Sequence, residues 1–147
     1  MSGNGARPEA QDVAERTAAT MERADAAVRS AGIRLLGVGP GRARTAMTVG
    51  PQHLNGHGLC HGGYLFLLAD AALAYASNSH GGPVVASGAD IVFLRPAAPG
   101  DELVAEASER ARSGRSGLYD VTVRAGEVTI AEFRGRTRAV PGLAAPH

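Results

Sequence analysis

The sequence predicts an α+β fold in which an antiparallel sheet wraps around one long helix. The segment 61–79 is dominated by Leu and Ala, with one Phe, and after Gly62-Gly63 it contains no Gly, Pro or β-branched residue, so it favours a helix. This helix is apolar on every side and must therefore be buried. The segments that follow it read as strands joined by short turns, which indicates an antiparallel sheet. A sheet that wraps around the helix buries the apolar helix and also buries one face of the sheet.

Caps and turns define the elements that precede the buried helix. Residues 1–11 are small and polar and are expected to be disordered. A helix is expected to begin at Asp12, with Glu15 three residues on as in a capping box, and to stop at Gly32. Two strands at 33–39 and 42–49 and a loop at 50–60 are expected to follow.

The chain is expected to form one domain, residues 12–140, followed by a flexible tail at 141–147. The strands predicted after the buried helix are 84–94, 102–112, 118–124 and 128–140. A single copy of this fold leaves part of the apolar helix uncovered. We therefore expect a homodimer on physical grounds.

Composition narrows the class of function. The chain has 147 residues and a formal net charge of +1, which gives no electrostatic footprint for nucleic acid or an anionic membrane. Its one cysteine cannot form an intrachain disulfide, and its N-terminus has no secretory signal. The most apolar run, 64–77, is too short to span a bilayer. We expect a cytoplasmic protein with no nucleic-acid or membrane partner.

Asp70 is the most informative residue for function. It is the only acidic or basic residue in the run from Gly62 to Ser79, and an unpaired carboxylate is costly to bury. Two interpretations are open. The carboxylate is structural, held by a backbone group, a hydroxyl or an Arg, or it is functional, with a tuned pKa at the edge of an apolar pocket.

A glycine-rich segment from Asn55 to Gly63 precedes the helix. Its glycines place backbone N–H groups at the helix N-terminus, where unsatisfied donors and the helix dipole suit a developing oxyanion. The alternative is a tight turn that only lets the loop pack closely. With Asp70 downstream, the catalytic interpretation becomes more specific.

The histidines of this region are not predicted to bind a metal, and its cysteine is not predicted to be a nucleophile. His53, His57 and His61 are evenly spaced, but no Cys or Asp partner pattern accompanies them, so solvated histidines and no metal site are expected. Cys60 is predicted to be a small buried thiol and not a nucleophile.

Helix geometry limits how Asp70 and the glycines cooperate. Gly62 and Asp70 are eight residues apart on one helix, which is roughly 12 Å at 1.5 Å per residue. A carboxylate cannot attack a carbonyl whose oxygen is held that far away. If the two groups act together, they come from different copies of the chain across a two-fold interface.

The pattern of Asn55, His-Gly-Gly at 61–63 and Leu-Ala-Asp at 68–70 is fairly specific. Together with 85–96, Gly100-Asp101 and 119–123, it resembles the phenylacetyl-CoA thioesterases (PaaI-type) of the hotdog superfamily. The resemblance covers roughly residues 30 to 140, nearly the whole predicted domain.

The resemblance implies hydrolysis of aromatic acyl-CoA thioesters, without a cofactor, by a hotdog dimer that is paired into a homotetramer. It implies that Asp70 is the nucleophile or general base, that Gly62 supplies the oxyanion N–H, and that Asn55 positions the thioester or water. Some related thioesterases have a Thr one turn after the carboxylate, where this sequence has Ala74. No hydroxyl assists from that position.

Coenzyme A is a polyanion and needs cations or hydroxyls at the pocket mouth. The expected substrate contacts are His61, Gly63, Ser87, Gly88, Arg95, Arg112 and Ser116, with Arg115, Arg134 and Ser113 as further candidates. Backbone at Ser87-Gly88 is expected to receive the pantetheine arm, as the resemblance implies. For any single Arg, a solvated strand face is the alternative.

Two other functions remain open from the sequence. A hotdog hydratase or dehydratase acting on acyl thioesters would pair an acid with a catalytic His, and His61 keeps that possibility. A non-catalytic acyl-CoA binder would tolerate Asp70→Asn without functional loss.

Overall fold

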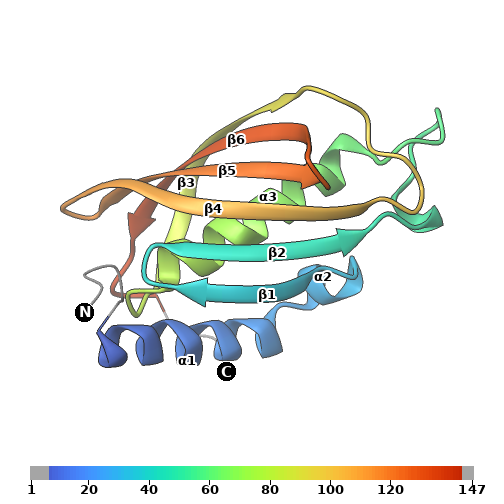
Figure 1. The fold of residues 1–147 in the computed structure, drawn as a ribbon. Coiled ribbons are helices and arrows are strands. Elements are labelled where there is room, and N and C mark those ends of the chain that lie inside the picture. Colours follow the sequence, from blue (N-terminus) through green and yellow to red (C-terminus); the bar gives the residue numbers. More distant parts are fainter. Residues whose placement is uncertain (1–6, 144–147) are drawn as a thin grey trace.

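A computed structural model describes residues 7–143 and contains one six-stranded antiparallel sheet (Figure 1). The strand order is β1-β2-β4-β5-β6-β3, so β1 and β3 are the edge strands. The strands are β1 (Arg34–Gly39), β2 (Arg42–Thr48), β3 (Val84–Phe93), β4 (Glu102–Ser113), β5 (Ser116–Ala125) and β6 (Val128–Ala139). Each agrees with its predicted segment to within about two residues.

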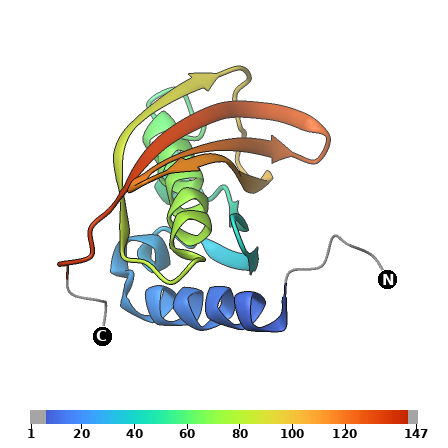
Figure 2. The same cartoon turned by 90° about the vertical axis from the view of Figure 1, so that its left-hand side faces the viewer.

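The long helix α3 (Gly62–Asn78) lies in the hollow of the curved sheet, as Figure 2 shows. Its core-facing residues, including Leu68 and Leu73, pack against buried strand residues such as Val121 and Phe133. The hydroxyl of Thr45 on β2 donates a hydrogen bond to the backbone oxygen of Leu68, 3.0 Å away. The predicted α+β fold, a sheet around a central helix, is confirmed.

One stripe of α3 is left partly uncovered by the chain. Its members follow helical spacing and are Gly62, Gly63, Phe66, Leu67, Asp70 and Ala74, of which Gly63 and Phe66 are exposed. The stripe matches the expectation that one copy leaves part of the helix uncovered.

The N-terminal helical region differs from the prediction in two ways. It consists of α1 (Pro8–Ala24) and the short α2 (Ala26–Ser30), not one helix. Helix α1 begins at Pro8, because a proline suits the first helical turn, so Asp12 is not its cap. Asp25 breaks the helix and accepts a hydrogen bond from the N–H of Val28, which makes it the cap of α2. Of the segment predicted to be disordered, 8–11 is helical and 1–6 lies outside the described residues.

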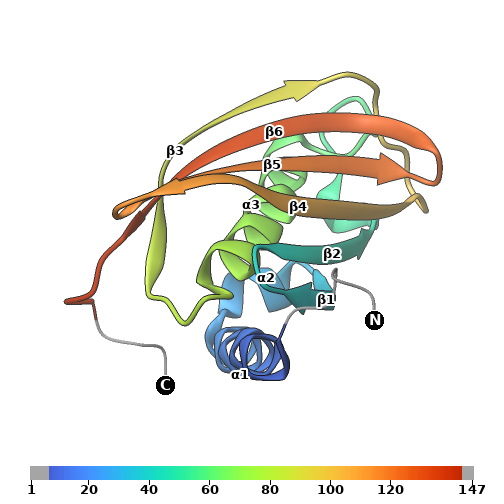
Figure 3. The ribbon, with the colours of Figure 1, turned by 60° about the vertical axis from the view of Figure 1, so that its left-hand side comes forward.

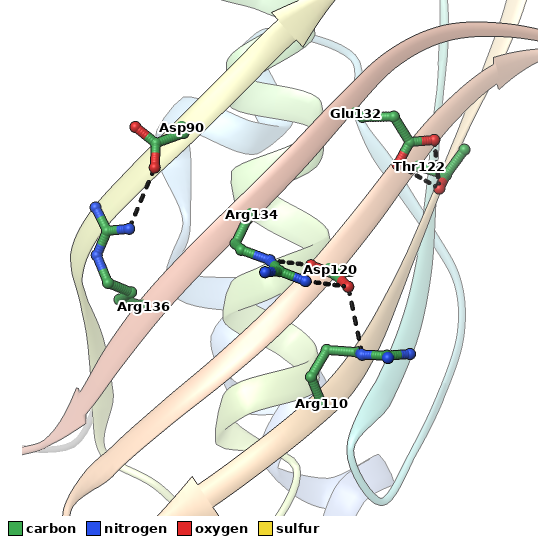
Figure 4. Close-up of polar contacts among 7 residues, drawn as sticks. All are labelled: Asp90, Arg110, Asp120, Thr122, Glu132, Arg134 and Arg136. Carbon is green, nitrogen blue, oxygen red and sulfur yellow. Dashed lines mark hydrogen bonds and ion pairs between the residues drawn. The ribbon is translucent and has the colours of Figure 1, made fainter.

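The face of the sheet turned away from α3 is polar and ion-paired (Figure 4). Arg134 binds Asp120 through two hydrogen bonds of 2.7 and 3.0 Å, and Arg110 contacts the same carboxylate at 3.4 Å. Arg136 reaches Asp90 on β3 at 3.2 Å. These exposed pairs contribute little each to stability but keep this face hydrophilic.

Strand β3 has one edge that no strand within residues 7–143 covers, as Figure 3 shows. Three consecutive residues at its end, Val92, Phe93 and Leu94, are exposed although they are apolar. An apolar edge strand is a site for pairing with another strand. In the described residues, no helix is long and apolar enough to span a membrane.

Candidate active site

The loop that leads into α3 is closed by its own hydrogen bonds. The N–H of Asn55 donates to the oxygen of Leu59 at 2.7 Å, and the N–H of His61 donates to the oxygen of His53 at 2.7 Å. Gly58, at φ +75°, makes the turn between these contacts. The loop therefore presents the start of α3 in a fixed position.

Asn55 holds this loop through its side-chain oxygen. Its Oδ1 accepts hydrogen bonds from the N–H groups of His57, at 2.8 Å, and Leu59, at 3.2 Å. The Nδ2 group makes no hydrogen bond within the part of the chain that the structure describes. Asn55 is thus oriented by the loop, with its amide donors available to a bound molecule.

The first turn of α3 contains an unused backbone donor. His61 caps the helix, because its Nδ1 accepts a hydrogen bond of 3.0 Å from the N–H of Gly63. The neutral ring of His61 consequently carries its proton on Nε2. The N–H of Gly62 donates to no acceptor among residues 7–143. A free N–H at the positive end of a helix is suited to bind an oxyanion.

Phe93, at the end of β3, lies directly against Gly62. A Cβ atom at residue 62 would be 2.9 Å from Cζ of Phe93, closer than carbon atoms pack. Only glycine therefore fits at this position without a shift of the ring. Sequence reasoning missed Phe93, because the contact joins two segments that are distant in the chain.

Asp70 is a partly buried carboxylate with no hydrogen bond or ion pair within the described residues. The structural interpretation, which required such a partner, is not supported in the single chain. Burial raises the pKa of Asp70, and the negative charge of Asp25 raises it further. The carboxylate is held in a less polar environment than water, as a general base or nucleophile requires.

The chain does not bring Asp70 and Gly62 together. Gly62 is the first residue of α3 and Asp70 follows eight residues later on the same continuous helix, roughly 12 Å away along its axis. One chain therefore holds two separate candidate half-sites: a backbone donor near Asn55 and His61, and a carboxylate two turns further on.

The predicted CoA contacts fall into two groups. Arg95 follows β3 close to the Gly62 end, and its Nη1 donates to the oxygen of Thr129 at 3.2 Å. Arg112 and Ser116 flank the β4–β5 turn. Ser116 is level with Val85, two strands away, and Val85 lies at the end of β3 opposite to Arg95. Ser87 occupies a bulge on the edge strand, next to Gly88.

Several candidate cations are already engaged. Arg112 contacts the carboxylate of Glu109 at 3.3 Å, and Arg134 is bound to Asp120 on the outer face. The guanidinium of Arg136 lies over Gly88. Arg95, Arg115 and Ser113 are exposed.

Two residues of the loop are buried and structural. The ring of His53 accepts from the N–H of Gly50 and bonds to the oxygen of Ala31, so the prediction of a solvated His53 is wrong. Cys60 is buried, and burial raises its pKa to about 11, which keeps it a thiol at neutral pH. The described residues contain no cluster of three or more His, Cys, Asp or Glu that would hold a metal.

Residues 57–132 match the family model of the thioesterase superfamily. The chain belongs to this superfamily. The thioesterase is 45% identical over 119 residues, 80% of its length, to the acyl-coenzyme A thioesterase PaaI of Escherichia coli K12, of which it covers 85%. The predicted enzyme class, a thioester hydrolase, is confirmed.

Solved structures agree with this family. The thioesterase is similar to the Escherichia coli PaaI protein from the phenylacetic acid degradation operon, with 42% identity, a TM-score of 0.87 and coverage of 90% of this chain and 96% of the other. A mutant of the phenylacetic acid degradation protein PaaI from Thermus thermophilus has 36% identity and a TM-score of 0.77, with coverage of 79% and 100%. The predicted hotdog fold and PaaI-type resemblance are confirmed.

Proposed function

We propose that this thioesterase hydrolyses aromatic acyl-CoA thioesters, of the phenylacetyl or hydroxyphenylacetyl type, to the free acid and CoA. The names of its PaaI relatives support both this substrate class and a place in phenylacetate degradation. The observation that carries the proposal is Asp70, a partly buried carboxylate without a partner in the described residues, on the uncovered stripe of α3.

The active unit is a homodimer in which each site combines Asp70 of one copy with Gly62 of the other. The free edge of β3, with exposed Val92, Phe93 and Leu94, supports pairing of two β3 strands around a two-fold axis. Antiparallel pairing would bring the Arg95 end of one copy to the Ser87 end of the other. Two dimers then pair into a tetramer, and the enzyme works in the cytoplasm.

The reaction needs a polarised carbonyl and a nucleophile. The N–H of Gly62 donates to the thioester oxygen and stabilises its negative charge in the tetrahedral intermediate. Asp70 either removes a proton from water, whose oxygen bonds to the carbonyl carbon, or attacks that carbon itself to give an anhydride that water then hydrolyses. In both routes the C–S bond breaks and CoA leaves as a thiolate, which needs no strong general acid.

Asn55 and His61, in the loop that leads into α3, support the binding of the thioester. The amide donors of Asn55 are free to hold the carbonyl or the attacking water. His61 uses Nδ1 as a helix cap, so its Nε2–H is a donor, and it does not fit the base that a hydratase would need. Gly63, Ser87, Gly88, Arg95, Arg112 and Ser116 are the proposed contacts of pantetheine and nucleotide.

Turnover of phenylacetyl-CoA by wild type and Asp70→Asn, followed through release of free thiol, tests the proposal. Asparagine keeps the shape of the side chain but has no negative charge. We expect the variant to fold and bind substrate, yet to lose about 100-fold or more in kcat. Wild-type turnover in a folded Asp70→Asn protein would contradict the role of Asp70. Enoyl products without thiol release would indicate a hydratase.

A further inference from the structure

The three phenylalanines of the sequence gather around the N-terminal half of α3. Phe66 lies on α3 itself, Phe93 at the end of β3, and Phe133 on β6, two residues from Phe93 in strand register. The rings of Phe66 and Phe133 pack edge to face, with centroids 5.1 Å apart. In a chain with 4% aromatic residues, this concentration is specific to one region.

Phe66 lies between the two candidate reactive groups. Gly62, Phe66 and Asp70 are four residues apart in turn, so they lie one above another on the same face of α3. This face is the stripe that the chain leaves uncovered. Phe66 is therefore one helical turn from the Gly62 donor, on the same face, and its ring lies beside a thioester bound to that donor.

Phe93 lies beside the residue that carries the free backbone donor. Its ring packs against the Gly62 position, yet 52% of the residue remains exposed, compared with 37% for Phe66 and 2% for Phe133. Buried Phe133 holds the Phe66 ring in place, so the open faces of Phe66 and Phe93 are presented by a rigid support. A carbonyl oxygen bound to the N–H of Gly62 has its acyl substituent beside these rings.

We propose that Phe93 and Phe66 form the wall that recognises the aryl ring of the acyl group, with Phe93 as the main determinant of selectivity. This inference rests on the proposed function, which supplies an aromatic acyl-CoA, and it names the residues that select it. Aromatic rings attract each other edge to face or offset, beyond the attraction that comes from the burial of area. A linear acyl chain of similar size obtains only the burial.

The experiment compares kcat/KM for phenylacetyl-CoA and hexanoyl-CoA in four variants. Phe93→Leu keeps an apolar side chain without a ring, and we expect the preference for phenylacetyl-CoA to fall about 3- to 10-fold. Phe93→Tyr keeps the ring and is expected to keep the preference. Phe66→Leu is expected to act in the same direction as Phe93→Leu. Leu36→Ala, at an exposed apolar residue of the opposite edge strand β1, is the control and should keep the wild-type ratio.

Each result separates this inference from the proposed function. Wild type that prefers hexanoyl-CoA would overturn both. Wild type that prefers phenylacetyl-CoA, with the same ratio in Phe93→Leu and Phe66→Leu, would overturn only the aryl wall. Sedimentation velocity of each variant shows whether assembly is retained, since a loss of assembly lowers both rates together and leaves their ratio unchanged. If Phe93→Leu does not assemble, Phe66→Leu carries the same test.

Discussion

The ring of Phe93 fills the space in which a side chain at residue 62 would lie, with Cζ 2.9 Å from where a Cβ would be. A side chain at residue 62 therefore fits only if the ring of Phe93 shifts away from the start of α3. The same contact places the proposed oxyanion donor beside the proposed acyl wall. A methyl group at residue 62 would disturb both.

Gly62→Ala is expected to lower kcat/KM by about 10- to 100-fold, because the N–H remains but the ring or the helix start must shift. The assay uses hexanoyl-CoA, so that the aryl wall does not enter. Phe93→Leu in the same chain removes Cζ and should restore part of the rate. Gly56→Ala is the control, since a Cβ there meets nothing within 4 Å. Full activity of Gly62→Ala would show that the close contact has no bearing on catalysis.

The pH dependence of turnover is expected to report Asp70. The ionised carboxylate is the active form, so activity should rise with pH through its pKa, which burial and then Asp25 raise above the ordinary Asp value. Asp25→Asn removes one of these causes and is expected to move the acid limb of kcat/KM to lower pH. Asparagine still caps α2, so the fold should be kept. An unchanged acid limb would exclude Asp25 as a source of the raised pKa.

The candidate site could be proposed from the sequence because its main groups lie in one continuous segment. Asp70 was recognised as a lone charge in an apolar helix. Asn55 and Gly62 were recognised because they lie in the glycine-rich segment that precedes this helix. The strands were predictable from turns and alternation. The helix start at Pro8 was missed because Asp12 and Glu15 imitate a capping box, whereas Asp12 pairs with Arg16 at 3.2 Å.

Contacts between distant segments could not be predicted. The packing of Phe93 on Gly62 and of Phe66 on Phe133 depends on how the sheet curves around α3. The contact of His53 with Ala31 depends on how the loop meets the end of α2. Local sequence patterns encode neither. For the same reason, the sequence did not show that Arg95 and Arg112, both predicted to contact CoA, lie at opposite ends of the sheet.

Glu109 is expected to stabilise the C-terminal end of α3. Its Oε1 accepts hydrogen bonds from the buried Tyr119 hydroxyl and from Nε2 of His80, which follows α3. Burial alone would raise its pKa, but these hydrogen bonds and the charge of Arg112 outweigh it and hold the pKa below the ordinary Glu value. The stabilisation is therefore present above the ordinary pKa and is lost as pH falls through the lowered one.

Glu109→Gln should lower the free energy of unfolding by about 1–2 kcal/mol at pH 7, measured by urea denaturation at fixed protein concentration. The difference from wild type should shrink below about pH 4, as the wild-type carboxylate takes up a proton. Glu106→Gln, on the exposed face of the same strand, should change stability little. Equal stability of wild type and Glu109→Gln at pH 7 would show that the contacts of Glu109 carry no net energy.

The shared active site predicts that two inactive variants restore activity in each other's presence. Gly62→Pro deletes the N–H donor, and proline suits the first position of a helix after the extended His61. Its Cβ also meets the ring of Phe93, as that of alanine does, so this half-site is inactivated while Asp70 of the same chain is kept. Asp70→Asn deletes the carboxylate charge. Alone, each variant forms dimers in which both sites lack one group.

In a mixed dimer, the Asp70→Asn chain supplies an intact Gly62 to the partner's intact Asp70, so one of the two sites is complete. If subunits exchange freely in an equal mixture, half of the dimers are mixed, and about one quarter of wild-type activity should return. Sedimentation of a mixture with one size-tagged chain verifies the exchange. Because Gly62 and Asp70 lie roughly 12 Å apart on one rigid helix, no rearrangement within a single chain joins them. Mixed dimers without activity would therefore reject the shared site and require a different donor or carboxylate.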